Sequence, residues 1–197
     1  MTHPGSPFWV LSPALQRHLN RTATGHADID WLSYVRALHL PASLGRALVI
    51  GCGNGDVERA LARKDGVRAI LAVDADPPAV ERARRQAERA GLTSISHAVF
   101  DPERDPLPDG PWDAVIASDV LHHVLALEGL LARVHAALAP GGRFVFIEYV
   151  GPNRFQYPQE RLELAQRYFR LLPDRLRREP ATGRTLWRWE RVDPLRL

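Results

Sequence analysis

Residues 47–56 read Ala-Leu-Val-Ile-Gly-Cys-Gly-Asn-Gly-Asp, a short apolar run followed by a glycine-rich turn. Four consecutive apolar residues that end in glycine are typical of a strand buried on both faces of a parallel sheet. The residues that follow, 56–63, have the spacing of a helix. A strand that leads through such a turn into a helix predicts the first unit of an α/β sheet.

The same alternation of strands and helices continues along the chain. Because consecutive parallel strands are joined by right-handed helical crossovers, the predicted fold class is α/β, a doubly wound, mostly parallel sheet with helices on both faces. The N-terminal residues 1–45 are predicted to form a helical lid segment, 46–150 the α/β core, and 151–197 a C-terminal helix and arginine-rich tail of the same domain. The further elements that we predict are strands at 69–73, 95–100, 114–117 and 144–147, and helices at 77–90, 125–138 and 159–172, the helix at 125–138 being ended by Pro140-Gly141-Gly142.

The composition of the chain excludes several classes of protein. Its 197 residues are 45% hydrophobic and 25% charged, which suits one folded domain and excludes disordered and collagen-like chains. No stretch is long and apolar enough for a membrane span, and no secretory signal is visible, so we expect a cytoplasmic protein with no membrane partner. The single cysteine, Cys52, excludes an internal disulfide and argues against a metal site.

The net charge of +3 is distributed unevenly. Residues 151–197 hold 11 of the 26 basic residues and 6 of the 23 acidic ones, so the positive excess lies in the last quarter of the chain. Arginine outnumbers lysine 25 to 1, which indicates codon bias rather than selection for phosphate contacts. Net charge bears on non-specific association rather than on fold, so a nucleic-acid partner is disfavoured. The pair Trp187 and Trp189 is likewise more typical of a packed tail than of base stacking.

The glycines of the turn predict a ligand-binding loop. Gly51, Gly53 and Gly55 allow positive φ angles and a close approach of a ligand to the backbone, and the next helix offers free N–H groups. A dinucleotide-binding fingerprint would place its third glycine at position 56, where Asp56 stands instead. Nicotinamide and flavin cofactors are therefore disfavoured.

An acidic residue follows the second predicted strand. Asp74 lies 19 residues after Gly55, and a carboxylate at this strand end can accept two hydrogen bonds from a ribose diol. The alternative is that Asp74 caps the next helix, a role that Asp76 can fill by itself. The position therefore favours a ribose-binding role.

Polar residues also close the third and fourth predicted strands. Asp101 follows Phe100, and a carboxylate beside an aromatic ring suits an adenine, although a turn before Pro102 is the alternative reading. Ser118 and Asp119 follow the fourth strand. Since the carboxyl ends of parallel strands meet at one edge of the sheet, we expect all these groups to converge on one crevice.

The segments at 47–56, 72–76, 100–101, 113–123 and 138–144 resemble, in order, the motifs of class I S-adenosylmethionine (SAM)-dependent methyltransferases. The resemblance covers residues 46–150 and implies SAM as cofactor and S-adenosyl-L-homocysteine (SAH) as product. Residues 148–156 also resemble a signature of a bacterial branch of small-molecule enzymes. The cofactor-binding residues that the resemblance implies are Gly51, Cys52, Gly53 and Gly55 at the methionine part, Asp74 at the ribose hydroxyls with Ala75 next to it, Phe100 and Asp101 at the adenine, and Ser118 or Asp119 beside the sulfonium.

The family's reaction is in-line transfer of the methyl group, here expected to go to a small-molecule acceptor. A general base is needed only for a poor nucleophile such as a hydroxyl, and the candidates are His122, His123 and Glu148. Two adjacent histidines should point apart, so we expect at least one of them to pack or cap. Arg21 is a candidate partner for the methionine carboxylate, with a solvated helix end as the alternative. Whether oxygen, nitrogen or carbon is methylated stays open.

The end of the chain departs from the family pattern. The family's sheet ends in an antiparallel hairpin, but only 47 residues follow Val150, and they hold one plausible strand, 185–192. The fifth strand is then an open edge. Three explanations remain: a truncated chain, a tail that packs over the edge, or a homodimer in which a second copy completes the sheet. The alternative functions are SAM binding without turnover and, with less support, methylation of RNA.

Overall fold

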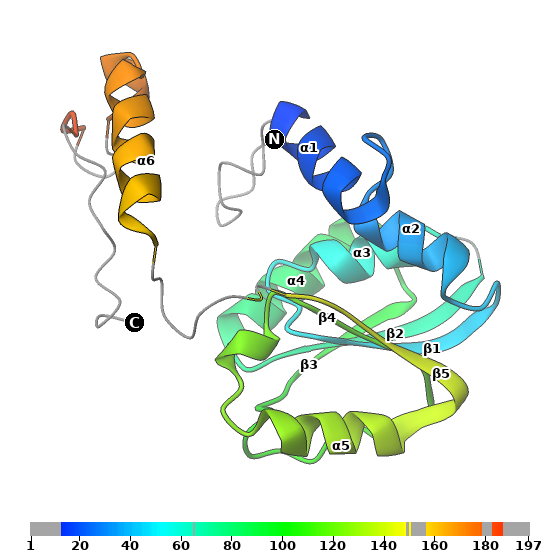
Figure 1. Cartoon of the computed structure of the whole chain (residues 1–197). Coiled ribbons are helices and arrows are strands. Elements are labelled where there is room, and N and C mark those ends of the chain that lie inside the picture. The colour runs from blue at the N-terminus through cyan, green and yellow to red at the C-terminus, as the bar shows by residue number, and fades with distance from the viewer. Residues whose placement is uncertain (1–12, 65, 149, 151–156, 179–182, 187–197) are drawn as a thin grey trace. The chain divides into compact units, whose positions relative to one another are not determined.

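The computed structural model describes residues 13–64, 66–148, 150, 157–178 and 183–186. The chain forms two compact units, residues 1–149 and 150–197, and each is described by itself. Figure 1 labels the elements. In chain order they are α1 (Pro13–Thr24), α2 (Trp31–Leu38), β1 (Leu44–Ile50), α3 (Asp56–Ala62), β2 (Val67–Asp74), α4 (Pro77–Arg89), β3 (Ile95–Val99), β4 (Trp112–Ser118), the short 3₁₀ turn η2 (Leu121–His123), α5 (Leu127–Ala137), β5 (Leu138–Ile147), α6 (Gln159–Leu171) and the 3₁₀ turn η3 (Asp174–Leu176).

The first unit is built on a five-stranded sheet in the order β3-β2-β1-β4-β5, with every neighbouring pair parallel. Ile50 at the end of β1 lies opposite Val73 of β2 and Ala117 of β4. The strand order reverses between β1 and β4, which is where open α/β sheets bind their ligands. The predicted doubly wound α/β fold is therefore confirmed.

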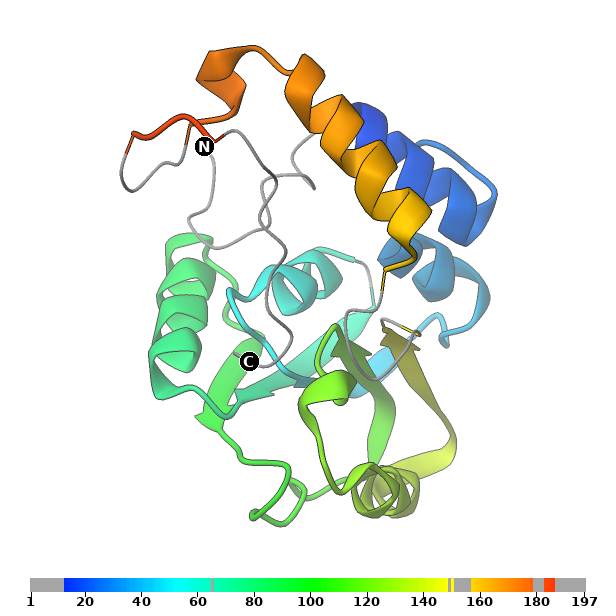
Figure 2. The same cartoon turned by 60° about the vertical axis from the view of Figure 1, so that its left-hand side comes forward.

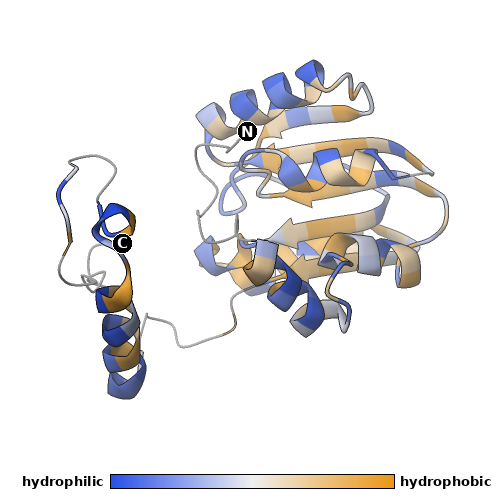
Figure 3. Cartoon of the chain, turned by 90° about the horizontal axis from the view of Figure 1, so that it is seen from above, coloured by the Kyte–Doolittle hydropathy of each residue, from blue (hydrophilic) through white to orange (hydrophobic). Residues whose placement is uncertain are grey.

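Alternate side chains of each strand pack against opposite helical layers. Ala47 and Val49 belong to the apolar core that also holds residues of α2, α3 and α4, whereas Leu48 and Ile50 belong to the core under α5. The two layers lie on the two faces of the sheet (Figure 1 and Figure 2). Figure 3 shows the consequence in colour, with apolar strands between helices whose outer faces are hydrophilic. Burial on both faces explains why the inner strands β1, β2 and β4 contain nearly continuous apolar runs.

The structure corrects two predicted boundaries. Helix α5 ends at Ala137, and Pro140-Gly141-Gly142 lies inside β5 rather than in a turn that stops the helix. The reason is close backbone packing, since a Cβ at Gly142 would lie 2.7 Å from the carbonyl oxygen of Trp112 on the neighbouring strand. The helix also begins later than predicted, at Leu127, after the turn η2.

The second unit contains α6 and η3, followed by an isolated antiparallel bridge between Arg178 and Thr185. The rest of the predicted strand at 185–192, and with it Trp187 and Trp189, lies outside the described residues, apart from Leu186. That residues 151–197 share a domain with the core stays a prediction. Within the part of the chain that the structure describes, no helix is both long enough and apolar enough to cross a membrane.

Candidate functional site

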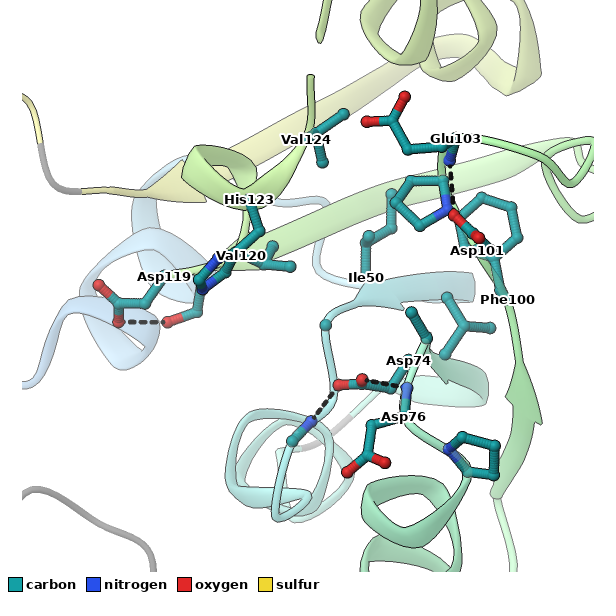
Figure 4. A pocket seen from close by; sticks show the side chains of 17 residues that line it. Ile50, Asp74, Asp76, Phe100, Asp101, Glu103, Asp119, Val120, His123 and Val124 are labelled. Carbon is teal, nitrogen blue, oxygen red and sulfur yellow. Dashed lines mark hydrogen bonds between the residues drawn. The ribbon is translucent and has the colours of Figure 1, made fainter. Parts of the chain in front are cut away.

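A cavity of about 720 Å³ opens at the carboxyl ends of β1, β2 and β4 and the loop after β3. It lies at the switch point of the sheet, and its wall is formed by the loops that leave these four strands (Figure 4). Most of the predicted cofactor-binding positions therefore meet in one place, although their roles stay predictions. The predicted residues that line the cavity are Gly51, Gly53, Asp74, Ala75, Phe100, Asp101, Ser118, Asp119 and His123.

Two glycines of the loop are packed so closely against their neighbours that a side chain is excluded at each of them. Gly51 has a φ of +75°, and a Cβ there would lie 2.5 Å from Val120 in the loop after β4. Gly55 has a φ of +81°, and its Cβ would lie 2.4 Å from the guanidinium of Arg59. A left-handed conformation and a close neighbour both demand glycine at these two positions. The loop can thus present bare backbone to a ligand.

Two buried polar residues of α3, Glu58 and Arg59, lie beside this loop, and a third, His97 of β3, contacts Glu58. The sequence pattern did not single out any of the three. Arg59 donates one hydrogen bond to the carbonyl of Asn54 and one to Asp56, each 2.6 Å long. Glu58 lies beside it and meets Nε2 of His97 on β3 at 3.1 Å. The side chains of Glu58 and His97 are 0% and 1% exposed. The sequence predicted only that residues 56–63 form a helix. Nothing in it indicated these contacts.

Asp74 is bound to the glycine loop rather than to the next helix. Its Oδ2 accepts from the N–H of Gly53 at 2.8 Å and its Oδ1 from the N–H of Asp76 at 3.0 Å. Asp76 caps α4 by accepting from the N–H of Ala79. The alternative in which Asp74 caps α4 is therefore wrong. Its carboxylate is fixed in place at the cavity wall, where both oxygens retain accepting capacity.

The loop after β3 contributes both apolar and acidic side chains to the cavity wall. Phe100 is 3% exposed and lines the cavity. Asp101 lines the cavity too, and its Oδ1 accepts from the N–H of Glu103. Asp101 therefore both stabilises the turn and contributes to the cavity wall. Glu103 was not predicted: it lines the cavity and its carboxylate accepts from the N–H groups of Leu125 and Ala126 ahead of α5. The sequence offered one indication of this role, namely that Glu103 lies only two residues after Asp101.

At the end of β4 the backbone takes an unusual conformation. Asp119 has a φ of +51°, a left-handed backbone conformation that residues other than glycine rarely adopt. Its N–H donates to the carbonyl of Ile147 on β5, and Oδ2 accepts from the hydroxyl of Ser118. These bonds hold the chain in the turn that leads to η2.

The two histidines of η2 contact each other, and a carboxylate holds one of them. Their ring centroids are 4.0 Å apart and the planes are inclined by 45°, so the prediction that they point apart is wrong. A 3₁₀ turn replaces the expected helix start, and it brings the neighbouring rings together. His123 lines the cavity, whereas Nδ1 of His122 meets Oε2 of Glu148 at 2.7 Å. Oε1 of Glu148 accepts from the N–H of Leu121 at 2.6 Å.

The remaining predicted residues lie apart from the cavity wall. Cys52 is buried in the core, Gly55 caps α3, and Arg21 is exposed in the last turn of α1. His122 and Glu148 do not line the cavity either. The exposed position of Arg21 suits the alternative of a solvated helix end.

We expect Cys52 to be chemically inert in the folded protein. Burial raises the pKa of its thiol to about 12, and the charges of Glu58 and Asp74 add to the effect. Near pH 8 the thiolate fraction then falls by about a thousandfold or more relative to a free cysteine. Alkylation by iodoacetamide, followed by mass spectrometry, should be slower by at least that factor in the native protein than in urea. Equal rates in both states would contradict this.

Comparison with known proteins gives a match to the family described as methyltransferase domain over residues 48–146, about half of the chain. A demethylmenaquinone methyltransferase from Thermus thermophilus is 32% identical over 69% of this chain and 61% of its own length. A ubiquinone biosynthesis O-methyltransferase from Methylocella silvestris is 35% identical over 71% of this chain and 53% of its own length. The matched chain thus spans less than two thirds of either relative.

Among solved structures, an S-adenosylmethionine-dependent methyltransferase from Mesorhizobium loti is 33% identical and superposes with a TM-score of 0.51. The match covers 59% of this chain and 51% of that protein. The family match over residues 48–146 includes all the residues that line the cavity.

Proposed function

The chain belongs to the methyltransferase domain family, and from this premise we propose that it uses SAM to methylate a small-molecule acceptor. The observation that carries the proposal is the cavity at the switch point, where the glycine loop, Asp74 and Asp101 face one space. The names of both sequence relatives refer to quinones, which are small molecules, and this supports the acceptor class.

The volume of the cavity and the residues that line it suit SAM. A volume of about 720 Å³ falls in the usual range for small-molecule sites. Asp74 is held where a carboxylate can accept from a ribose diol, and Phe100 offers an apolar face to a base. Gly51 and Gly53 leave the space over the loop free of side chains.

The negative charge of the cavity wall favours SAM over cofactors that carry phosphate groups. Five acidic residues line it, while none of its described lining residues is lysine or arginine. Such a wall attracts a ligand that carries a sulfonium and an ammonium group, and it repels a pyrophosphate. The five acidic lining residues are Asp74, Asp76, Asp101, Glu103 and Asp119.

When bound, the cofactor supplies a methyl group that its positive sulfur has already activated. The chain then has to align an acceptor and keep water away. We assign Asp74 and the glycine loop to holding the ligand, and Ser118 and Asp119 to the end of the cavity nearest η2. We assign the acceptor to the side of η2 and Glu148, where β4 and β5 end.

The partner, the cellular setting and the alternative functions complete the proposal. A second copy of the chain at the β5 side of the sheet is the partner that we favour, and a cytoplasmic setting is the one that we expect. SAM binding without turnover is the alternative function, and RNA methylation has less support because the cavity wall is acidic.

Calorimetric titration with SAM and SAH tests the proposed function. We expect both to bind at one site per chain with dissociation constants in about the micromolar range. NADH is the matched control, because it shares the adenosine but carries a pyrophosphate, and it should not bind. If neither SAM nor SAH binds, the proposed function is wrong.

A further inference from the structure

His122 and Glu148 form a pair just outside the cofactor cavity. The carboxylate of Glu148 is 9% exposed, and it faces Nδ1 of His122 at 2.7 Å. The ring of His122 is 41% exposed, so a molecule arriving from solvent can reach it. The two residues come from the ends of neighbouring strands, 26 positions apart in the chain. The pair is thus placed on the side where we locate the acceptor.

The contacts of Glu148 decide which nitrogen of the imidazole carries the proton. One carboxylate oxygen already accepts from the N–H of Leu121, and the other faces Nδ1. An ionised carboxylate can only accept, so Nδ1 must donate to it. The neutral ring then carries its proton on Nδ1 and keeps a lone pair on Nε2. A histidine held in this tautomer is ready to accept a proton at Nε2.

Building on the proposed function, we propose that His122 is the catalytic base for a hydroxyl acceptor and that Glu148 is its positioning residue. The acceptor oxygen forms the new bond to the methyl carbon while the bond from that carbon to sulfur breaks. The electron pair of the broken bond stays on sulfur and gives neutral SAH. The hydroxyl proton moves to Nε2 of His122, and the resulting imidazolium is stabilised by Glu148. It returns the proton to solvent before the next turnover.

His123 is less suited to this role, although it lines the cavity. Among the described residues no hydrogen bond fixes its ring, so nothing selects its tautomer. Its ring contacts the ring of His122, with the two centroids 4.0 Å apart, and of the two only His123 lines the cavity. His123 therefore belongs to the wall that the cofactor meets, and His122 to the space beyond it.

Transfer of a labelled methyl group from SAM to phenol, catechol and aniline tests the proposal. Aniline is the matched probe, because its neutral nitrogen attacks without losing a proton first. The wild type should methylate at least one of the two hydroxyl probes. His122→Gln should then lower kcat for that probe by about a hundredfold and Glu148→Gln by about tenfold, with KM changed by less than about threefold. Any transfer to aniline should not depend on His122.

Two further measurements keep this test separate from that of the proposed function. Binding of SAH to His122→Gln should stay within about threefold of the wild type, because His122 lies outside the cofactor cavity. Imidazole nitrogen NMR of labelled protein should show His122 as the Nδ1–H tautomer, a preference lost in Glu148→Gln. His135, exposed on α5, provides the reference signal and, as His135→Gln, the control variant.

Each outcome is decisive. A wild type that binds SAH but transfers no methyl group to either hydroxyl probe overturns the hydroxyl assignment and leaves the proposed function intact. Full kcat in His122→Gln, or a tautomer of His122 that Glu148→Gln does not change, overturns the base and its positioning. Failure of the wild type to bind SAH overturns the proposed function, and this inference falls with it.

Discussion

Replacing Asp74 by alanine should weaken the binding of SAH by about 100-fold or more. The variant removes the carboxylate that we assign to the two ribose hydroxyls, and hydrogen bonds to a charged group contribute about 1.5–3 kcal/mol each. It also removes the acceptor for the N–H of Gly53 and so loosens the glycine loop. The measurement is calorimetric titration with SAH, with circular dichroism to verify that the variant is folded.

Two variants serve as controls for this prediction. Asp74→Asn keeps one accepting oxygen and should lose about tenfold in affinity. Asp28→Ala removes an exposed carboxylate that pairs with Arg17 at the surface, and its affinity should match that of the wild type. An Asp74→Ala protein that is folded and binds SAH with unchanged affinity would refute the ribose role.

The second large effect concerns stability rather than binding. Replacing His97 by leucine should lower the free energy of unfolding by about 3–5 kcal/mol, because it leaves Glu58 fully buried without its partner. The other carboxylate oxygen of Glu58 already has no hydrogen-bond partner among the described residues. Urea denaturation followed by circular dichroism gives the value.

A double variant distinguishes a broken pair from a simple loss of packing. If the pair is the cause, the combined change of Glu58→Leu and His97→Leu should be less destabilising than His97→Leu alone, because no polar group is then left unpartnered in the core. The surface change His135→Gln is the control and should alter stability by less than about 0.5 kcal/mol. A loss of under about 1 kcal/mol in His97→Leu would show that the pair contributes little.

The fold could be predicted because burial on both faces of the sheet leaves a direct trace in the sequence. The run Leu48–Ile50 of β1 is apolar at every position and is followed by a turn and the helix α3. The start of β5 could not be predicted, because Pro140, Gly141 and Gly142 are ordinarily breakers. Here close contact with the backbone of Trp112 makes Gly142 a strand residue.

The candidate site could be predicted in part, for a reason that lies in the topology. Residues at the ends of parallel strands must meet, so Asp74, Asp101 and Asp119 could be expected at one cavity before any coordinates were known. The pairing of His122 with Glu148 and of His97 with Glu58 could not, because each pair spans two elements and depends on rotamers. Helical spacing alone also gave no reason to expect a carboxylate in the core at position 58.

The contact between Gly51 and Val120 limits how this chain can vary over evolutionary time. The space that a side chain at position 51 would need is filled by Val120, and the backbone of Gly51 is left-handed as well. A side chain gained at position 51 would therefore have to be matched by a smaller residue at position 120 and by a new loop conformation. Intermediates with only one of these changes would be penalised, so the two loops are expected to be inherited together as one unit.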